Sequence, residues 1–128
     1  MTNENLYFER LIQAVQLLAS NYETQVSSFP DFVHVPDEVA LIYSDCFLLA
    51  DQIAECGLLN KPQLIKLREL DNALRKMSSK GNEEVWTCEA LKTSPEWQNI
   101  RSLASDVLSI LERSKQQPDL SWLVYVKE

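Results

Sequence analysis

The sequence predicts an all-α fold, a single-domain array of about five helices over residues 1–128 with a short extended or β-like C-terminal segment. Apolar residues recur at intervals of three and four along most of the chain, as on the buried face of a helix. The composition is that of a globular protein, with 45% hydrophobic and 24% charged residues. A length of 128 residues suits one core.

The first predicted helix covers residues 2–26, where the apolar stripe is continuous. Pro30 ends any helix before it, so the chain is a connector up to residue 35. The second predicted helix starts at Pro36, which the first turn of a helix tolerates. It ends at Gly57, a residue that readily adopts a left-handed turn.

Three further helices are predicted in the second half. Asn60 and Pro62 open a helix whose apolar stripe extends to Met77. A short helix follows over residues 83–91. The stretch SPE at 94–96 places an N-cap, a first-turn proline and a first-turn acid in order, and it opens the last helix.

Residues 120–126, LSWLVYV, are β-branched and aromatic, as in a strand. The sequence offers no second strand candidate. The segment therefore either lies extended across the helices or pairs with another molecule by strand addition. The second possibility predicts a non-enzymatic interaction or regulatory module, homodimeric through this segment.

Several features of the sequence predict the cellular location of the protein. The apolar runs fall far short of the roughly 20 residues that cross a bilayer. Glu4 and Glu9 stand where a signal peptide carries positive charge, so we expect a cytoplasmic protein with no membrane partner. The three cysteines are an odd number, which predicts reduced thiols of core type rather than a disulfide framework. They are Cys46, Cys56 and Cys88.

The sequence offers little for catalysis. His34 is the only histidine, and no serine or cysteine pattern accompanies it, so we interpret it as a capping or loop-fixing imidazole. Metal-ligand spacings are absent, and two glycines are too few for a phosphate-binding loop. Glu83, Glu84 and Glu89 only loosely resemble the acidic motifs of helical hydrolases. We therefore expect no enzyme activity, no cofactor and no bound metal.

Negative charge is concentrated in the first half of the chain. Residues 1–60 hold nine acids and one base, a net charge of −8, whereas residues 61–128 hold ten acids and eleven bases. Such a distribution repels nucleic acid and favours a basic protein partner. On the second predicted helix the carboxylates fall on one face without basic partners four residues away, which is either a solvated face or a binding surface. They are Asp37, Glu38, Asp45, Asp51 and Glu55.

The connector before that helix has a mixed character. Leaving its apolar side chains in water is costly, so Phe29, Val33 and Val35 are predicted to face inward as a plug between the first two helices. Asp31 and Asp37, with Phe32 or His34, are then presented at the rim of the plug.

The stretches FPDFVHVPDEVAL at 29–41 and WTCEALKTSPEW at 86–97 resemble a known family. They are similar to the small, acidic, all-helical immunity proteins encoded beside bacterial polymorphic toxins, including those of contact-dependent growth inhibition. The resemblance covers about residues 6–112. It implies a protein that binds one cognate toxin, often a basic nuclease, and blocks its active site or substrate path. The charge argument selects the expected contact residues: Asp31, Phe32, His34, Asp37, Glu38, Asp45, Asp51 and Glu55.

Overall fold

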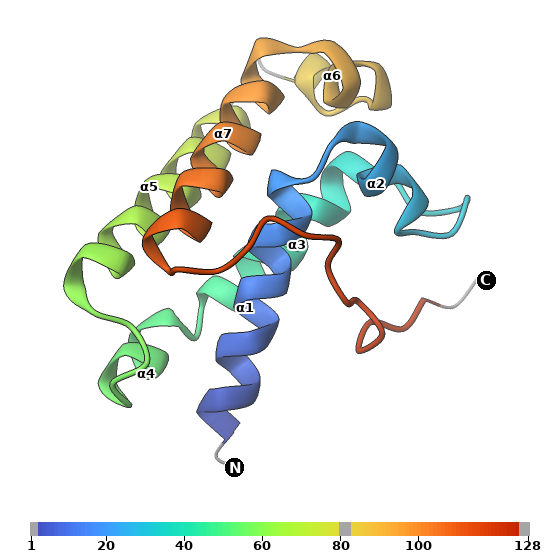
Figure 1. Ribbon diagram of the computed structural model, residues 1–128. Coiled ribbons are helices and arrows are strands. Elements are labelled where there is room, and N and C mark those ends of the chain that lie inside the picture. The colour runs from blue at the N-terminus through green and yellow to red at the C-terminus, as the bar shows by residue number, and fades with distance from the viewer. Residues whose placement is uncertain (1–2, 80–82, 126–128) are drawn as a thin grey trace.

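The computed structural model describes residues 3–79 and 83–125, and these form seven α-helices and one 3₁₀ turn with no β-strand (Figure 1). The all-α prediction is confirmed. The expected number of about five is corrected to seven, because two of the predicted helices are each divided. The elements are α1 (Asn3–Ala19), α2 (Tyr22–Ser27), α3 (Val35–Phe47), α4 (Ala50–Glu55), α5 (Lys61–Met77), η1 (Glu83–Val85), α6 (Cys88–Thr93) and α7 (Pro95–Ile110).

The first predicted helix is divided between α1 and α2. The side chain of Asn21 accepts a hydrogen bond from the backbone N–H of Thr24 at 2.8 Å, so it caps a new helix rather than continuing the old one. The buried Gln25 side chain then donates to the carbonyl oxygens of Leu17 and Leu18 at 3.1 and 3.3 Å. These bonds satisfy carbonyls at the end of α1 that have no partner further along the helix.

The second predicted helix is divided between α3 and α4 at residues 48–49. Neither proline nor glycine marks this break, so local propensity does not explain it. Beyond the break, Ala50 and Ile53 are buried, and α4 packs against α1 and α5. Tertiary packing therefore overrides helix propensity here. Gly57 follows α4 with a φ of 83°, which confirms its predicted left-handed turn.

The predicted starts of α5 and α7 are confirmed by their caps. Asn60 and Gln63 form a reciprocal capping box, with Pro62 in the first turn. Ser94 accepts from the backbone N–H of Trp97 at 3.2 Å, and Pro95 is the first residue of α7. These bonds satisfy backbone donors at helix starts that would otherwise be unpaired.

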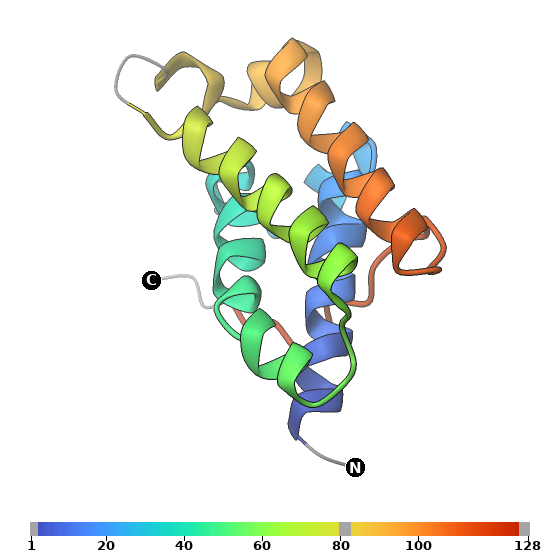
Figure 2. The ribbon, with the colours of Figure 1, turned by 90° about the vertical axis from the view of Figure 1, so that its left-hand side faces the viewer.

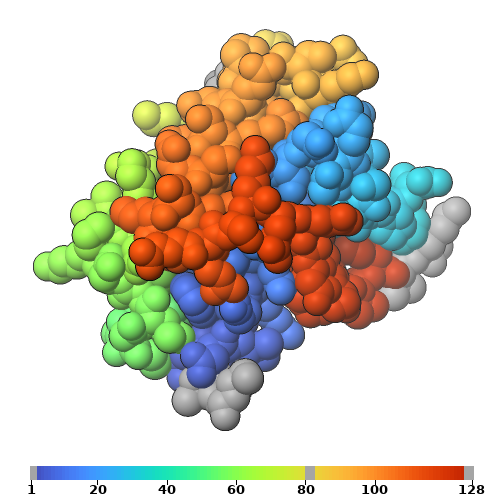
Figure 3. All heavy atoms as spheres, in the orientation of Figure 1, coloured from blue at the N-terminus to red at the C-terminus, as the bar shows by residue number. Residues whose placement is uncertain are grey.

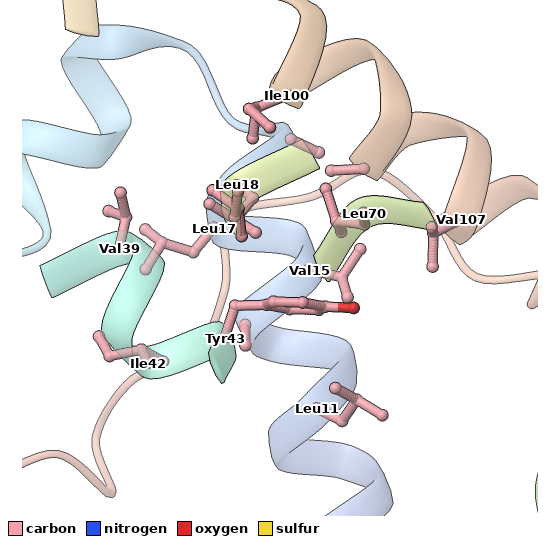
Figure 4. Close-up of a cluster of buried hydrophobic side chains, with 14 of the residues drawn as sticks. Leu11, Val15, Leu17, Leu18, Val39, Ile42, Tyr43, Leu70, Ile100 and Val107 are labelled. Atoms are coloured by element: carbon pink, nitrogen blue, oxygen red, sulfur yellow. The ribbon is translucent and has the colours of Figure 1, made fainter. Parts of the chain in front are cut away.

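The four longest helices surround one hydrophobic core. Helix α1 packs against α3 on one side and α7 on the other, and α5 packs against α7 and α3 (Figures 1 and 2). Figure 4 shows the centre of this core, where side chains of all four helices meet. The labelled residues are Leu11, Val15, Leu17 and Leu18 of α1, Val39, Ile42 and Tyr43 of α3, Leu70 of α5, and Ile100 and Val107 of α7.

Two polar side chains bridge elements in or beside the core. The fully buried Tyr43 hydroxyl donates to the carbonyl oxygen of Leu67 on α5 at 2.6 Å. Arg101 of α7 donates to the carbonyl oxygen of Ser20 at 3.1 Å, to the side chain of Gln25 at 2.8 Å and to the carbonyl oxygen of Leu91. Arg101 therefore links α7 to the α1–α2 junction and to α6.

The C-terminal segment, defined here as residues 113–125, lies across α1 (Figure 3). The indole N–H of Trp122 donates to Gln13 of α1 at 2.6 Å, and the Tyr125 ring meets Phe29 edge to face at 5.7 Å. The expected extended or β-like conformation is not confirmed, since the described part of this segment contains a turn and no strand. Val126, like Thr2 in the first predicted helix, lies outside the described residues.

Candidate functional site

The chain makes a turn at residues 31–34 and enters the first turn of α3 at residues 35–37; we call residues 31–37 together the acidic turn. It is held from within as predicted: Phe29 and Val35 are buried, and Val33 packs against the same core. Burying side chains of this size contributes roughly 1.5–3 kcal/mol each. The turn is therefore fixed at both ends by the core.

Asp31 and Phe32, at the start of the acidic turn, project outward. Asp31 is exposed, and the Phe32 ring keeps 45% of its surface accessible. The exposed part of this ring contributes nothing to the burial of the core. The plug and the rim expected from the sequence are thus both present.

His34 fixes the turn to a distant part of the chain. Its Nε2 atom lies 2.8 Å from the carbonyl oxygen of Trp86, and because a carbonyl can only accept, Nε2 carries the proton and donates. The same nitrogen lies 3.9 Å from Asp37 Oδ1. Of the two roles expected for the imidazole, this contact supports the loop-fixing one, while the His34 side chain makes no capping hydrogen bond to α3.

The carboxylates of α3 differ in their surroundings. Asp37 and Asp45 are exposed. Glu38 is half-buried and accepts a hydrogen bond from the hydroxyl of Tyr125 at 2.9 Å. That hydrogen bond and partial burial raise the pKa of Tyr125 above its ordinary value, burial being the larger cause. Glu38 is thus partly occupied by the C-terminal segment.

The carboxylates of α4 do not continue the face of α3, because the helix is interrupted at residues 48–49. Asp51 forms an ion pair with Arg68 of α5 at 3.1 Å, and Glu55 is exposed. The expectation of five carboxylates on one exposed helix face is therefore wrong. The sequence could not predict this arrangement, because no nearby residue marks the helix break or identifies Arg68 as the partner of Asp51.

Besides Glu38, which bonds to Tyr125, four of the expected acidic contact residues have no lysine or arginine partner among the described residues. Over residues 3–79 and 83–125, no lysine or arginine forms an ion pair with Asp31, Asp37, Asp45 or Glu55. Of these, Asp31 and Asp37 belong to the acidic turn and Asp45 lies two helical turns beyond Asp37. The candidate site is the acidic turn together with the exposed part of α3.

A groove adjoins this site, which we call the α3–α5 groove. Its volume is about 480 Å³, and sequence reasoning missed it because its walls come from distant segments. Its lining residues are Asp37, Ala40, Leu41 and Ser44 of α3, Asp71, Leu74 and Arg75 of α5, and Ser78 and Trp86. Asp37 belongs to both the acidic turn and the groove.

The Cys46 thiol is not an activated nucleophile. Burial raises the pKa of Cys46 to about 11, with Asp45 adding to the rise and Arg10 opposing it, so its thiol is protonated at neutral pH. Cys56 and Cys88 are exposed, which corrects the expectation of core-type thiols at those two positions. All three cysteines are free, as expected.

The described residues also provide no metal centre and no membrane span. No group of three or more His, Cys, Asp or Glu side chains in this part of the chain could hold a metal ion. None of the helices described here combines the length and apolar character needed to cross a bilayer.

Comparison of the chain with family models, with curated proteins and with solved structures finds no match. The geometry of the site and the sequence resemblance are therefore the basis for a functional proposal.

Proposed function

We propose that the protein is a non-enzymatic inhibitor, an immunity protein that binds and neutralises a basic bacterial toxin of the nuclease type. One observation carries the proposal. The acidic turn is fixed by its own core contacts and by His34, yet it directs Phe32 and unpaired carboxylates into solvent. A surface held in one conformation before binding loses little entropy when a partner docks.

Charge supports the choice of a basic partner. The net charge of −8 on residues 1–60 attracts a cationic protein over several ångströms and accelerates encounter. Asp31, Asp37 and Asp45 can then pair with lysine or arginine side chains of the toxin. In this proposal they stand in for the phosphates of the toxin's nucleic-acid substrate.

Phe32 supports a specific complex over a purely electrostatic one. Interfaces draw most of their free energy from a few aromatic or arginine side chains near the centre, surrounded by polar contacts. Phe32 has this position, with Asp31 and Asp37 in the same turn. We place the complex in the cytoplasm, where a nuclease toxin meets its substrate.

Binding to the product of the neighbouring gene tests the proposal. We expect the purified protein to capture a basic nuclease-like protein at equal stoichiometry and to protect cells from it. High salt should slow association, because it screens the charges that steer it. Capture of no basic protein by the folded chain would overturn the proposal.

Charge reversal tests which surface of the protein binds the toxin. We expect the double variant Asp37→Lys and Asp45→Lys to lose capture and protection while keeping its helical circular dichroism. The matched control is Asp106→Lys with Glu112→Lys, which changes the net charge equally at exposed positions in the second half. Equal loss in both variants, or full protection by the folded first variant, would overturn the assignment of this surface.

A further inference from the structure

We propose that the α3–α5 groove receives one arginine side chain of the protein partner. This inference rests on the proposed function and names the chemistry that the inhibitor recognises. The groove is adjacent to the acidic turn, since Asp37 lines the groove and Trp86, which also lines it, accepts the His34 hydrogen bond through its carbonyl oxygen. A partner that binds the acidic turn at Asp37 therefore contacts the groove as well.

The shape and lining of the groove suit a long side chain with an apolar stem. Its volume of about 480 Å³ falls within the roughly 300–1,000 Å³ typical of ligand pockets. Ala40, Leu41 and Leu74 supply apolar walls from both helices. Leu41 is 51% exposed, so an aliphatic stem laid against it would remove apolar surface from water.

The charges in the groove select a cation. Asp71 is only 9% exposed in its side chain and is bonded through Oδ2 to Arg75 Nε at 2.7 Å. Asp37 lines the same groove and has no lysine or arginine partner among the described residues. These three groups carry one net negative charge, which disfavours an anionic occupant and leaves Asp37 available to a guanidinium group.

Trp86 distinguishes arginine from lysine. Its indole N–H already donates to the carbonyl oxygen of Met77 at 2.8 Å, and its ring packs edge to face on Trp97 at 5.4 Å. The ring is therefore held in place by its own chain. A planar guanidinium group stacks on such a ring and can still pair with a carboxylate, whereas an ammonium group is more strongly hydrated and cannot stack.

Titration with a small probe tests the groove without any toxin. N-acetyl-arginine amide is added to the full-length, ¹⁵N-labelled protein, and the Trp86 indole and Leu41 backbone signals are followed by NMR. We expect saturable shifts in the millimolar range, confined to groove residues. N-acetyl-citrulline amide, which is uncharged, and N-acetyl-lysine amide should each bind more weakly. Equal binding of either one, or shifts centred elsewhere, would overturn the assignment to arginine.

Two matched pairs of variants test whether the probe binds at the groove residues. Asp37→Asn should weaken binding of the arginine probe about threefold to fivefold, as expected for an exposed charge pair, whereas Asp45→Asn should not change it. Leu41→Arg should fill the groove and abolish binding. Leu48→Arg, at a residue that is 76% exposed and outside the groove, should bind as the wild type does. Thermal melts establish that each variant is folded, and equal behaviour within either pair would overturn the proposal.

Different experimental outcomes would overturn the arginine-binding groove and the proposed inhibitor function. Absence of arginine binding in the titration would overturn the groove and leave capture of a basic toxin intact. Arginine binding by a chain that captures no basic toxin would overturn the proposed function, and with it the natural role assigned to the groove.

Discussion

The Nε2 atom of His34 lies 2.8 Å from the carbonyl oxygen of Trp86, a residue 52 positions further along the chain. This bond joins the acidic turn to the segment between η1 and α6. Because Trp86 packs on the fully buried Trp97, the turn is connected through two rings to the core. The conformation of the proposed binding surface therefore depends on residues that do not belong to it.

Replacement of His34 by alanine should loosen the acidic turn. We expect a loss of about 1 kcal/mol in the free energy of unfolding, the usual contribution of one hydrogen bond. Amide hydrogen exchange at Val33 and Val35 should accelerate, while exchange in α7 stays slow. The control is Gln52→Ala, which removes an exposed side-chain bond to Glu4. Unchanged exchange in the turn would contradict a fixing role for His34.

Replacement of Phe32 by alanine should weaken toxin binding more than it weakens the fold. A side chain at the centre of an interface typically contributes about 2 kcal/mol or more, which is roughly a thirtyfold loss of affinity. Isothermal titration against the captured toxin measures the loss. Leu48→Ala is the matched control, since it also removes an exposed apolar side chain. Similar affinities of the two variants would show that Phe32 lies outside the interface.

Replacement of Tyr43 by phenylalanine should change the alkaline stability. Burial raises the pKa of Tyr43 above its ordinary value, with Asp71 adding to the rise. Because the pKa of the hydroxyl is higher in the folded than in the unfolded state, its contribution to the free energy of unfolding is complete below about pH 10. That contribution is lost as the pH rises from there toward the folded-state pKa. Urea unfolding between pH 7 and 11 should show a shallower decline in the variant.

The same variant should lose about 1 kcal/mol at neutral pH, because the Leu67 carbonyl oxygen loses its hydroxyl donor. Lysines and cysteines titrate in both proteins, so the difference between the two curves reports Tyr43. Tyr125→Phe provides a comparison, with a smaller change in slope because Tyr125 is only half-buried. Parallel curves for the wild type and the Tyr43 variant would contradict the argument.

Replacement of Arg101 by lysine should destabilise the fold by about 2–4 kcal/mol. The three oxygens that Arg101 serves lie on three different segments, and a single ammonium group cannot reproduce the fork of a guanidinium. Burial also lowers the pKa of Arg101, which shows that its charge is partly removed from water. Urea unfolding measures the loss. Arg68→Lys, at an exposed ion pair, should cost no more than about 0.5 kcal/mol, and equal losses would contradict the assignment.

The sequence predicts helices best where the signal is local. Asn60 and Ser94 cap helices with their own neighbours, so the starts of α5 and α7 were correctly predicted. Asn21 is also a capping residue, but the continuous apolar stripe hides it. The break at residues 48–49 has no local marker at all, since it depends on how α4 packs against α1 and α5.

The features of the candidate site also divide into those that the local sequence predicts and those that depend on tertiary contacts. The inward positions of Phe29 and Val35 and the exposure of Phe32 follow from local hydrophobicity. The partners of Glu38 and Asp51 are Tyr125 and Arg68, which no rule of spacing connects to them. Likewise, the α3–α5 groove exists only once helices far apart in the chain lie side by side, so its lining could not be predicted from the sequence.

The position of the C-terminal segment has a consequence for how the protein is made. Trp122 meets Gln13 across 109 residues, and Arg113 meets Glu9 across 104. Helix α1 is made before the segments that pack on it, and its contacts with Arg113 and Trp122 form only after the C-terminal segment has been synthesised. At about 5–20 residues per second, the side of α1 that carries Glu9 and Gln13 waits several seconds for these partners. A translational stall before residue 113 would therefore leave this side of α1 in water.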